Sequence, residues 1–81
     1  MRNMVKTKTV EGRTYNMFFD SADSGEDRGQ YGFSIDDAEV AEVTTDVALA
    51  KGIFAKLTAG AVSPVHLMDV IEDSITEEAM V

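Results

Sequence analysis

Cysteine is absent from this 81-residue sequence, and histidine and proline each occur once. Without cysteine the chain can form neither a disulfide framework nor a thiolate metal site, and one histidine is too few for a structural zinc site. No apolar run approaches the roughly 20 residues of a membrane-spanning helix, and the N-terminus lacks an apolar run of signal-peptide length. We therefore expect a cytoplasmic protein with no membrane partner.

Positive charge is also scarce, because 7 Lys and Arg residues face 15 Asp and Glu residues, for a formal net charge of −8. Residues 1–19 carry four cations and one acid, for a charge of +3. Residues 20–46 carry one cation and nine acids (−8), and residues 47–81 carry two cations and five acids (−3). Binding to a phosphate backbone needs clustered cations, so we expect no direct contact with nucleic acid. An acidic surface instead favours solubility or a basic protein partner.

The length and hydrophobic content define the size of the expected domain. With 44% hydrophobic residues the chain is too apolar to be wholly disordered, and 81 residues make one small domain with a small core. We expect this single domain to span residues 1–81. Its ordered core should cover about residues 4–75, with a mobile loop at residues 20–29 and a frayed tail at residues 76–81.

The first half of the chain shows the period of two that is typical of β-strands. Tyr15, Met17 and Phe19 share one face of a strand, and we expect this face to line the core. A fourth strand is less regular than the first three in its alternation. The predicted strands cover residues 4–10, 13–19, 30–35 and 38–44.

Two glycines carry specific predictions about the sheet. Glu11 and Gly12 connect the first two strands, and because Glu resists positive φ we expect a type I turn with Gly12 as the left-handed residue of a bulge. Gly32 lies between the aromatic residues Tyr31 and Phe33, which indicates a bulge or a close neighbour packed against its backbone.

The second half of the chain has the period of an amphipathic helix in two segments, residues 46–58 and 63–75. Thr45 is the predicted N-cap of the first helix and Gly60 its left-handed terminator, while Ser63 should cap the second helix. The apolar side of the first helix contains Val47, Leu49, Ala50, Ile53, Phe54 and Leu57. The apolar side of the second contains Leu67, Met68, Val70, Ile71 and Ile75.

Because the strands precede the helices, the sequence predicts an α+β fold. We expect an antiparallel β-meander of three to four strands followed by two α-helices packed on one face.

The acidic back of the second helix is the first candidate site. His66, Asp69, Glu72 and Asp73 lie opposite its apolar side, and a histidine beside carboxylates can ligate a metal or act as a base. However, one helix alone rarely completes such a site, and no second histidine exists. We therefore predict no catalytic residue, no metal site and no cofactor.

The same four residues form a candidate partner-binding surface. Asp69 and Asp73 are like charges four residues apart, and Glu72 and Asp73 lie near the expected negative end of the helix dipole. No Lys or Arg follows Lys56 to offset them, so a cationic partner would relieve the repulsion. Two interpretations remain open: a binding surface for another protein, or a plainly solvated face.

Small residues on the first helix form the second candidate site. Ala48, Gly52 and Ala55 follow one another at i, i+4 and i+7, and a glycine inside a helix costs about 1 kcal/mol relative to alanine. Such a strip permits the close approach of another element. It is therefore either a self-association or partner-docking face, or an ordinary surface containing a glycine.

Three stretches of the chain resemble an uncharacterised family of short proteins from Gram-positive anaerobic gut bacteria, a domain of unknown function. They are Tyr31-Gly32-Phe33, Thr44-Thr45-Asp46 and Ser-Pro-Val-His-Leu-Met-Asp-Val-Ile-Glu-Asp at residues 63–73. The resemblance covers about residues 4–75. It implies a bacterial cytoplasmic protein. It assigns no activity, cofactor, substrate or site residue, because none is established for the family.

The leading functional hypothesis is a small non-enzymatic bacterial protein that acts through protein contacts, as an accessory or regulatory module. One alternative is an acidic mimic that occupies the basic surface of a nucleic-acid-binding protein. Another is a metal- or small-ligand-binding protein centred on His66. A homo-oligomer formed through the Gly52 strip is compatible with the first hypothesis.

Overall fold

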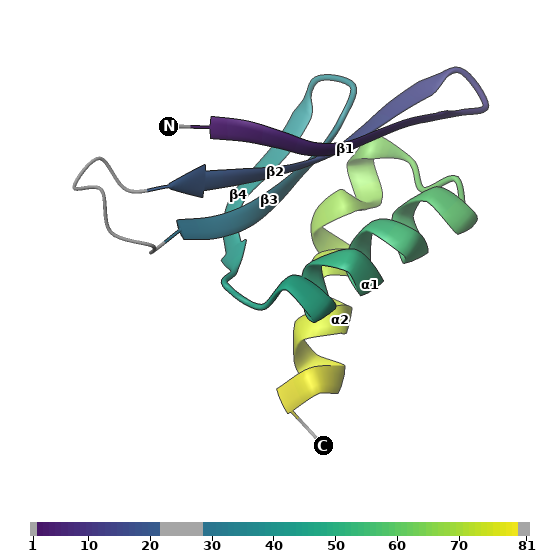
Figure 1. Ribbon diagram of the computed structural model, residues 1–81. Coiled ribbons are helices and arrows are strands. Elements are labelled where there is room, and N and C mark those ends of the chain that lie inside the picture. Colours follow the sequence, from purple (N-terminus) through teal and green to yellow (C-terminus); the bar gives the residue numbers. More distant parts are fainter. Residues whose placement is uncertain (1, 22–28, 80–81) are drawn as a thin grey trace.

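The computed structural model describes residues 2–21 and 29–79, and for residues 78 and 79 only the backbone (Figure 1). Four antiparallel strands pair in sequence order, and the helices lie on one face of this sheet. The strands are β1 (Arg2–Val10), β2 (Arg13–Ser21), β3 (Gly29–Ile35) and β4 (Ala38–Thr44); α1 (Val47–Ala59), a 3₁₀ turn η1 (Pro64–His66) and α2 (Leu67–Ala79) follow. The predicted α+β meander with two helices is confirmed.

Two predicted boundaries differ from those observed. Asp20, Ser21 and Gly29 belong to strands, and the rest of the predicted mobile loop lies outside the described residues. Helical backbone continues through Ala79, where the sequence indicated a frayed tail from residue 76.

The turn between β1 and β2 is tighter than predicted. Val10 pairs with Arg13, and the two residues between them both have positive φ, 49° at Glu11 and 80° at Gly12. Positive φ at both central positions defines a type I′ turn, so the expected type I turn is wrong. The twist of a type I′ turn matches the right-handed twist of the paired strands, and this match outweighs the reluctance of Glu11 to adopt positive φ.

The core forms where the helix-facing side of the sheet meets both helices. α1 packs on β2 and β3, while α2 packs on α1 and β4. The predicted core face is confirmed for Tyr15 and Met17, whereas Phe19 is half-buried and its ring packs at a tilt against that of Tyr31, with ring centroids 4.8 Å apart. The buried core comprises Tyr15, Met17, Phe33, Ile35, Ala50, Ile53, Phe54, Leu57, Leu67 and Ile71.

The opposite face of the sheet contains a buried aromatic residue, Phe18, that the period-two analysis missed. Phe18 is 1% exposed, because its ring lies against Gly32 on one side and the Arg2 guanidinium covers it, 3.8 Å from the ring centroid. Both predictions for Gly32 are confirmed. The Phe18 ring is its close neighbour, and the pairing of β3 with β4 shifts register between Tyr31 and Phe33, as a bulge does.

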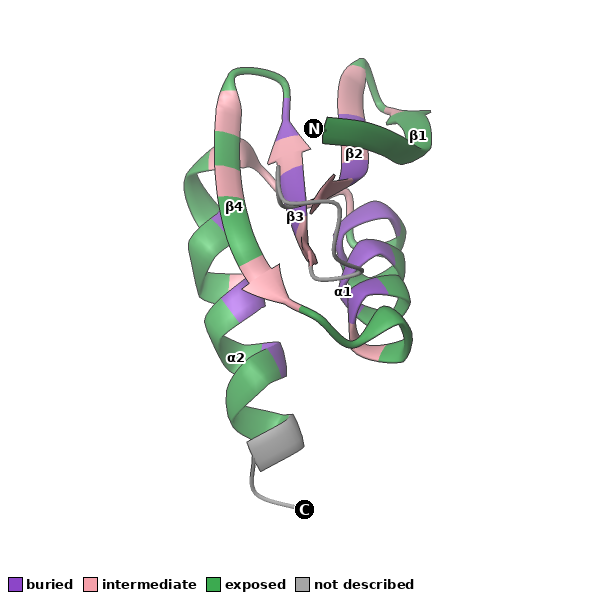
Figure 2. Ribbon diagram, turned by 60° about the vertical axis from the view of Figure 1, so that its left-hand side comes forward, coloured by how far each residue is buried: buried purple, intermediate pink, exposed green. Residues whose placement is uncertain are grey.

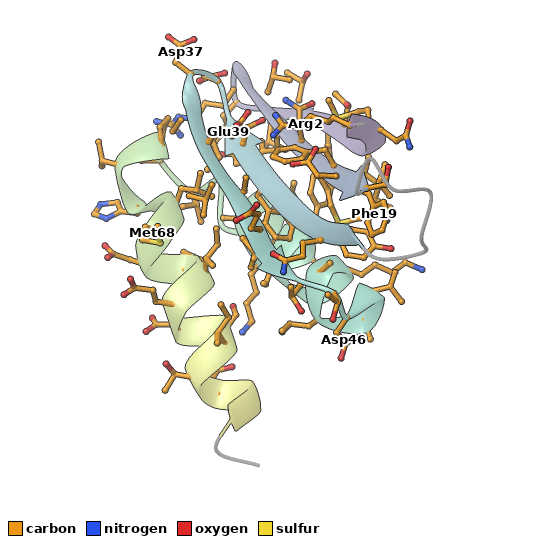
Figure 3. All side chains as sticks on the ribbon, turned by 90° about the vertical axis from the view of Figure 1, so that its left-hand side faces the viewer. Arg2, Phe19, Asp37, Glu39, Asp46 and Met68 are labelled. Atoms are coloured by element: carbon orange, nitrogen blue, oxygen red, sulfur yellow. The ribbon has the colours of Figure 1, made fainter. Side chains whose placement is uncertain are left out.

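Arg2 also connects distant strands across this open face. Its guanidinium forms ion pairs with Asp20 on β2 and Glu39 on β4, each 2.7 Å long, and Figure 3 shows Arg2 and Glu39 beside each other. The hydrogen bond from Arg2 holds the pKa of Asp20 below its usual value. One N-terminal side chain thus links the first strand to the last.

Both ends of α1 differ from the prediction by one residue. Asp46, and not Thr45, is the N-cap, because its Oδ1 accepts hydrogen bonds from Ala48 N at 2.8 Å and Leu49 N at 3.3 Å. At the other end Gly60 has φ −89° and Ala61 takes the left-handed conformation with φ 45°. The N–H of Ala61 bonds to Thr58 O and that of Val62 to Leu57 O, which is a Schellman motif centred one residue later than predicted.

The register of α2 also differs from the prediction. Leu67 and Ile71 are buried as expected, but Met68 is 47% and Ile75 is 40% exposed, while Ser74 is only 4% exposed. The chain first forms the 3₁₀ turn η1, and α2 begins at Leu67 and turns its Leu67–Ile71–Ser74 stripe inward. The Ser74 hydroxyl donates to Val70 O at 2.9 Å, so its burial leaves no polar atom unsatisfied.

Two further helix predictions are corrected. The Ser63 side chain forms no capping hydrogen bond; instead its carbonyl oxygen accepts one from His66 N at 2.9 Å. Val47, expected on the apolar side of α1, is 45% exposed in the first turn of the helix.

Candidate functional site

The acidic face predicted on the second helix lies on the solvent side of η1 and α2. His66, Asp69, Glu72 and Asp73 are all exposed, and the only hydrogen bond or ion pair that the described structure has among them joins His66 Nδ1 to Asp69 Oδ2 at 3.4 Å. An ion pair this exposed contributes little to stability. Among the residues that the structure describes, no three His, Cys, Asp or Glu side chains are grouped so that they could hold a metal ion.

The charge argument for this face changes with the observed helix length. Because α2 continues to Ala79, Glu72 and Asp73 lie before its last turn, and the helix dipole acts mainly within that turn. Repulsion between Asp69 and Asp73 therefore remains, but the dipole contributes little to it. Lys56 on α1 pairs with Glu77 at 2.9 Å, farther along the helix, and forms no ion pair with the acidic face within the described part of the chain.

Exposed apolar side chains adjoin these carboxylates. Six large apolar side chains of the described residues are exposed, and three of them, Val65, Met68 and Ile75, lie on η1 and α2. Met68, Glu72 and Ile75 follow one another at i, i+4 and i+7, so they form one stripe along the helix. Figure 3 labels Met68 on the surface of α2. We call Val65, Met68, Asp69, Glu72, Asp73 and Ile75 the outer face of α2.

Sequence reasoning found the acidic half of this face and missed the apolar half. Met68 and Ile75 were assigned to the core because they border the ideal apolar side of a helix starting at Ser63. The end of α2 projects beyond the sheet, as Figure 2 shows, and Ile75 on this part of the chain is 40% exposed. The only sequence signal for this outcome is the Ser-Pro step at residues 63–64, which favours an irregular first turn.

The small-residue strip on α1 borders a groove between the two helices. Ala48, Gly52 and Ala55 are all exposed, and a Cβ built on Gly52 meets no atom within 4 Å. No close contact within the described structure therefore requires a glycine at this position. The groove has a volume of about 370 Å³ and is lined by Asp46, Ala48, Leu49, Gly52, Ile53, Lys56, Ser74 and Glu77, but not by Ala55.

The ionisable groups of the groove already have structural partners. The Asp46 carboxylate caps α1, while Lys56 Nζ lies 2.9 Å from Glu77 Oε2 and 3.4 Å from Ser74 Oγ. The floor contains the apolar side chains of Leu49 and Ile53. The ionisable groups of the groove therefore already bond within the chain, and the outer face of α2 is the better candidate for a binding site.

This chain is a small α+β protein, because a four-stranded antiparallel meander is followed by two helices on one face. Its candidate site lies on a helix surface. A family model described as "Family of unknown function (DUF6514)" matches residues 3–77, and the chain belongs to this family. The match confirms the resemblance to an uncharacterised family. No curated protein and no solved structure matches the chain. Within the described residues, every helix is too short or too polar to cross a membrane.

Proposed function

We propose that this protein is a non-enzymatic interaction module of the cytoplasm, with an accessory or regulatory role, and that the outer face of α2 binds its partner. The observation that supports this proposal most strongly is the Met68–Glu72–Ile75 stripe, in which two large apolar side chains stay exposed beside the Glu72 carboxylate, which forms no ion pair among the described residues. Exposed apolar patches with a polar rim are typical of protein-binding surfaces.

The chemistry of the face defines the partner's surface. Burying the exposed halves of Met68 and Ile75 would contribute about 1 kcal/mol each, since full burial of such a side chain is worth about 1.5–3 kcal/mol. α2 contains no Lys or Arg, so Asp69, Glu72 and Asp73 attract cations from outside the helix. The partner should therefore present an apolar centre flanked by Lys or Arg, and charge complementarity would increase the association rate and the specificity.

Affinity capture with matched variants tests this proposal. The intact protein and the variant Asp69→Asn/Asp73→Asn would each be used to capture proteins from a lysate of the source organism, with quantitative mass spectrometry. The control is Glu11→Gln/Asp37→Asn, which changes the net charge equally at exposed positions in the two hairpin turns.

We expect at least one protein that the intact protein and the control capture and the α2 variant does not. A second variant, Met68→Ser/Ile75→Ser, should lose the same protein, because the apolar half of the face contributes to binding. Equal capture by the intact protein and both α2 variants would contradict the proposal. If the captured protein binds nucleic acid and oligonucleotides release it, the outcome supports the acidic mimic as the specific form of this function.

The hypothesis of a metal- or small-ligand-binding protein centred on His66 has a separate test. Thermal unfolding in the presence of zinc, manganese or calcium should leave the melting temperature unchanged, because His66 has one carboxylate within 4 Å among the described residues. A rise that disappears in His66→Ala would favour the metal hypothesis.

A further inference from the structure

The first strand forms a free edge of the sheet. β1 pairs with β2 along one side only, and both helices pack over the other three strands. All residues of β1 except Val10 are exposed, and Figure 2 shows the strand almost entirely in the exposed colour. An edge strand carries a row of backbone N–H and C=O groups that can pair with another strand.

The two faces of this edge differ in charge. Lys6 and Lys8 pair with the core residues Met17 and Tyr15, so their side chains lie on the helix side of the sheet. Lys6 Nζ lies 6.0 Å from the Phe54 ring centroid. On the opposite face, Thr7 and Thr9 are uncharged.

α1 carries a third cation, which lies one helical turn before Phe54. Lys51 is exposed and precedes Phe54 by three residues, so the two side chains are neighbours on α1. Lys6, Lys8 and Lys51 form no ion pair with any residue in the described ranges. In a chain with net charge −8, the two lysines of the edge strand and Lys51 on α1 thus remain without an ion pair in the described ranges.

The backbone is more regular at this edge than at the other. β4 contains Glu42 with φ 56°, and its pairing with β3 shifts register between Tyr31 and Phe33. The pairing of β1 shifts only between Met4 and Lys6, so the ladder from Lys6 to Val10 is uninterrupted. This segment can therefore accept a continuous run of backbone hydrogen bonds.

We propose that the Lys6–Val10 segment of β1 binds an extended acidic segment of another protein as a fifth strand of the sheet. Carboxylates at alternate positions of that segment would face Lys6 and Lys8, because the side chains of a strand alternate between the two faces. A second copy of β1 is a poor occupant, since it would bring lysines opposite lysines, and like charges directly opposed are destabilising. This surface is separate from the outer face of α2 and takes a partner of opposite charge.

The test uses a capped peptide of alternating threonine and glutamate, titrated into the isotope-labelled full-length protein and followed by NMR. A peptide with lysine in place of glutamate reports charge selectivity. The glutamate peptide with N-methyl groups on one edge of its backbone reports the need for strand pairing. We expect amide shifts and slowed hydrogen exchange in β1 with the glutamate peptide alone.

Two variants with the same change in net charge complete the design. Lys6→Gln/Lys8→Gln removes the cations on the helix side, and we expect an affinity about tenfold lower, because two cross-strand charge pairs are lost. Thr7→Glu/Thr9→Glu places two negative charges on the opposite face of the same strand, where we expect less than about a threefold loss at physiological salt. Both variants change exposed positions, and their melting temperatures verify folding.

Several results would overturn the proposal. They are equal binding of the glutamate and lysine peptides, undiminished binding of the N-methylated peptide, shifts that centre away from β1, or no binding at millimolar peptide. Self-association through β1, seen as a dimer by light scattering, would identify a second copy as the occupant and would also overturn it.

Discussion

Gly32 and Gly52 provide a matched pair of glycine-to-alanine substitutions with opposite expected effects. A Cβ on Gly32 would lie 2.5 and 2.7 Å from two ring carbons of Phe18 and 2.8 Å from the backbone oxygen of Val40. The Phe18 ring cannot withdraw freely, because the Arg2 guanidinium lies 3.8 Å from its centroid on the open face. Either the ring or the β3–β4 pairing must therefore shift.

The magnitude follows from this crowding. Forcing an additional carbon into a well-packed site typically costs 1–3 kcal/mol, and we expect about 2–3 kcal/mol for Gly32→Ala because one of the crowded atoms belongs to the backbone. For a domain of this size, 1 kcal/mol shifts the melting temperature by about 4–8 °C. The variant should therefore melt roughly 10–20 °C below the unmodified protein.

Gly52→Ala should have the opposite effect. Gly52 lies inside α1, and its added Cβ would meet no atom within 4 Å. Alanine restricts the unfolded chain and favours helix, so we expect a gain of about 0.5–1 kcal/mol in the free energy of unfolding.

Urea and thermal unfolding, followed by far-ultraviolet circular dichroism, measure both variants under one set of conditions. The combination Gly32→Ala/Phe18→Leu should cost less than the sum of its two single changes, because the smaller side chain leaves room for the new Cβ. A stability for Gly32→Ala within 0.5 kcal/mol of the unmodified protein (roughly the range of a neutral surface change) would refute the packing argument. A destabilised Gly52→Ala would contradict the open space around Gly52 on which the second prediction rests.

Two further predictions concern the capping of α1 and the ion pair on the open face. Asp46→Ala should lower the free energy of unfolding by about 1 kcal/mol, because the Asp46 side chain caps α1, whereas Thr45→Ala should leave it nearly unchanged. Urea unfolding of both variants would measure the difference. A larger loss for Thr45→Ala than for Asp46→Ala would contradict the assignment of the cap. Because the pKa of Asp20 is lowered in the folded state, its ionised form stabilises the protein above the unfolded pKa of about 4, and this contribution is lost as the pH falls through the folded pKa. The stability advantage of the unmodified protein over Asp20→Asn should therefore narrow during acid titration, and an advantage that does not depend on pH would disprove the coupling to Arg2.

Local sequence signals predicted most of the architecture. The β-branched and aromatic alternation located four strands, and helical periodicity located both helices, because these patterns depend on neighbours a few residues away. Tyr15 and Met17 were placed in the core for the same reason. The family resemblance rested on equally local stretches and is confirmed over residues 3–77.

Predictions failed where a distant contact decided between similar local alternatives. Glu11 adopts positive φ because the twist of two long strands selects the turn, and Phe18 is buried because Arg2 reaches over it from the neighbouring strand. Asp and Thr are both favourable N-cap residues, so residue type alone does not decide between Asp46 and Thr45. The choice between them depends on where the chain leaves β4 and enters α1.

The candidate site shows the same division. Composition and periodicity alone determined that His66, Asp69, Glu72 and Asp73 lie on the solvent side of η1 and α2. The tertiary structure alone determined that Met68 and Ile75 join them there, because the 3₁₀ turn sets the rotation of α2 and the sheet ends before the helix does. A sequence specifies which side chains can share a helix face, but the extent of the surface packed against that helix decides which of them are buried.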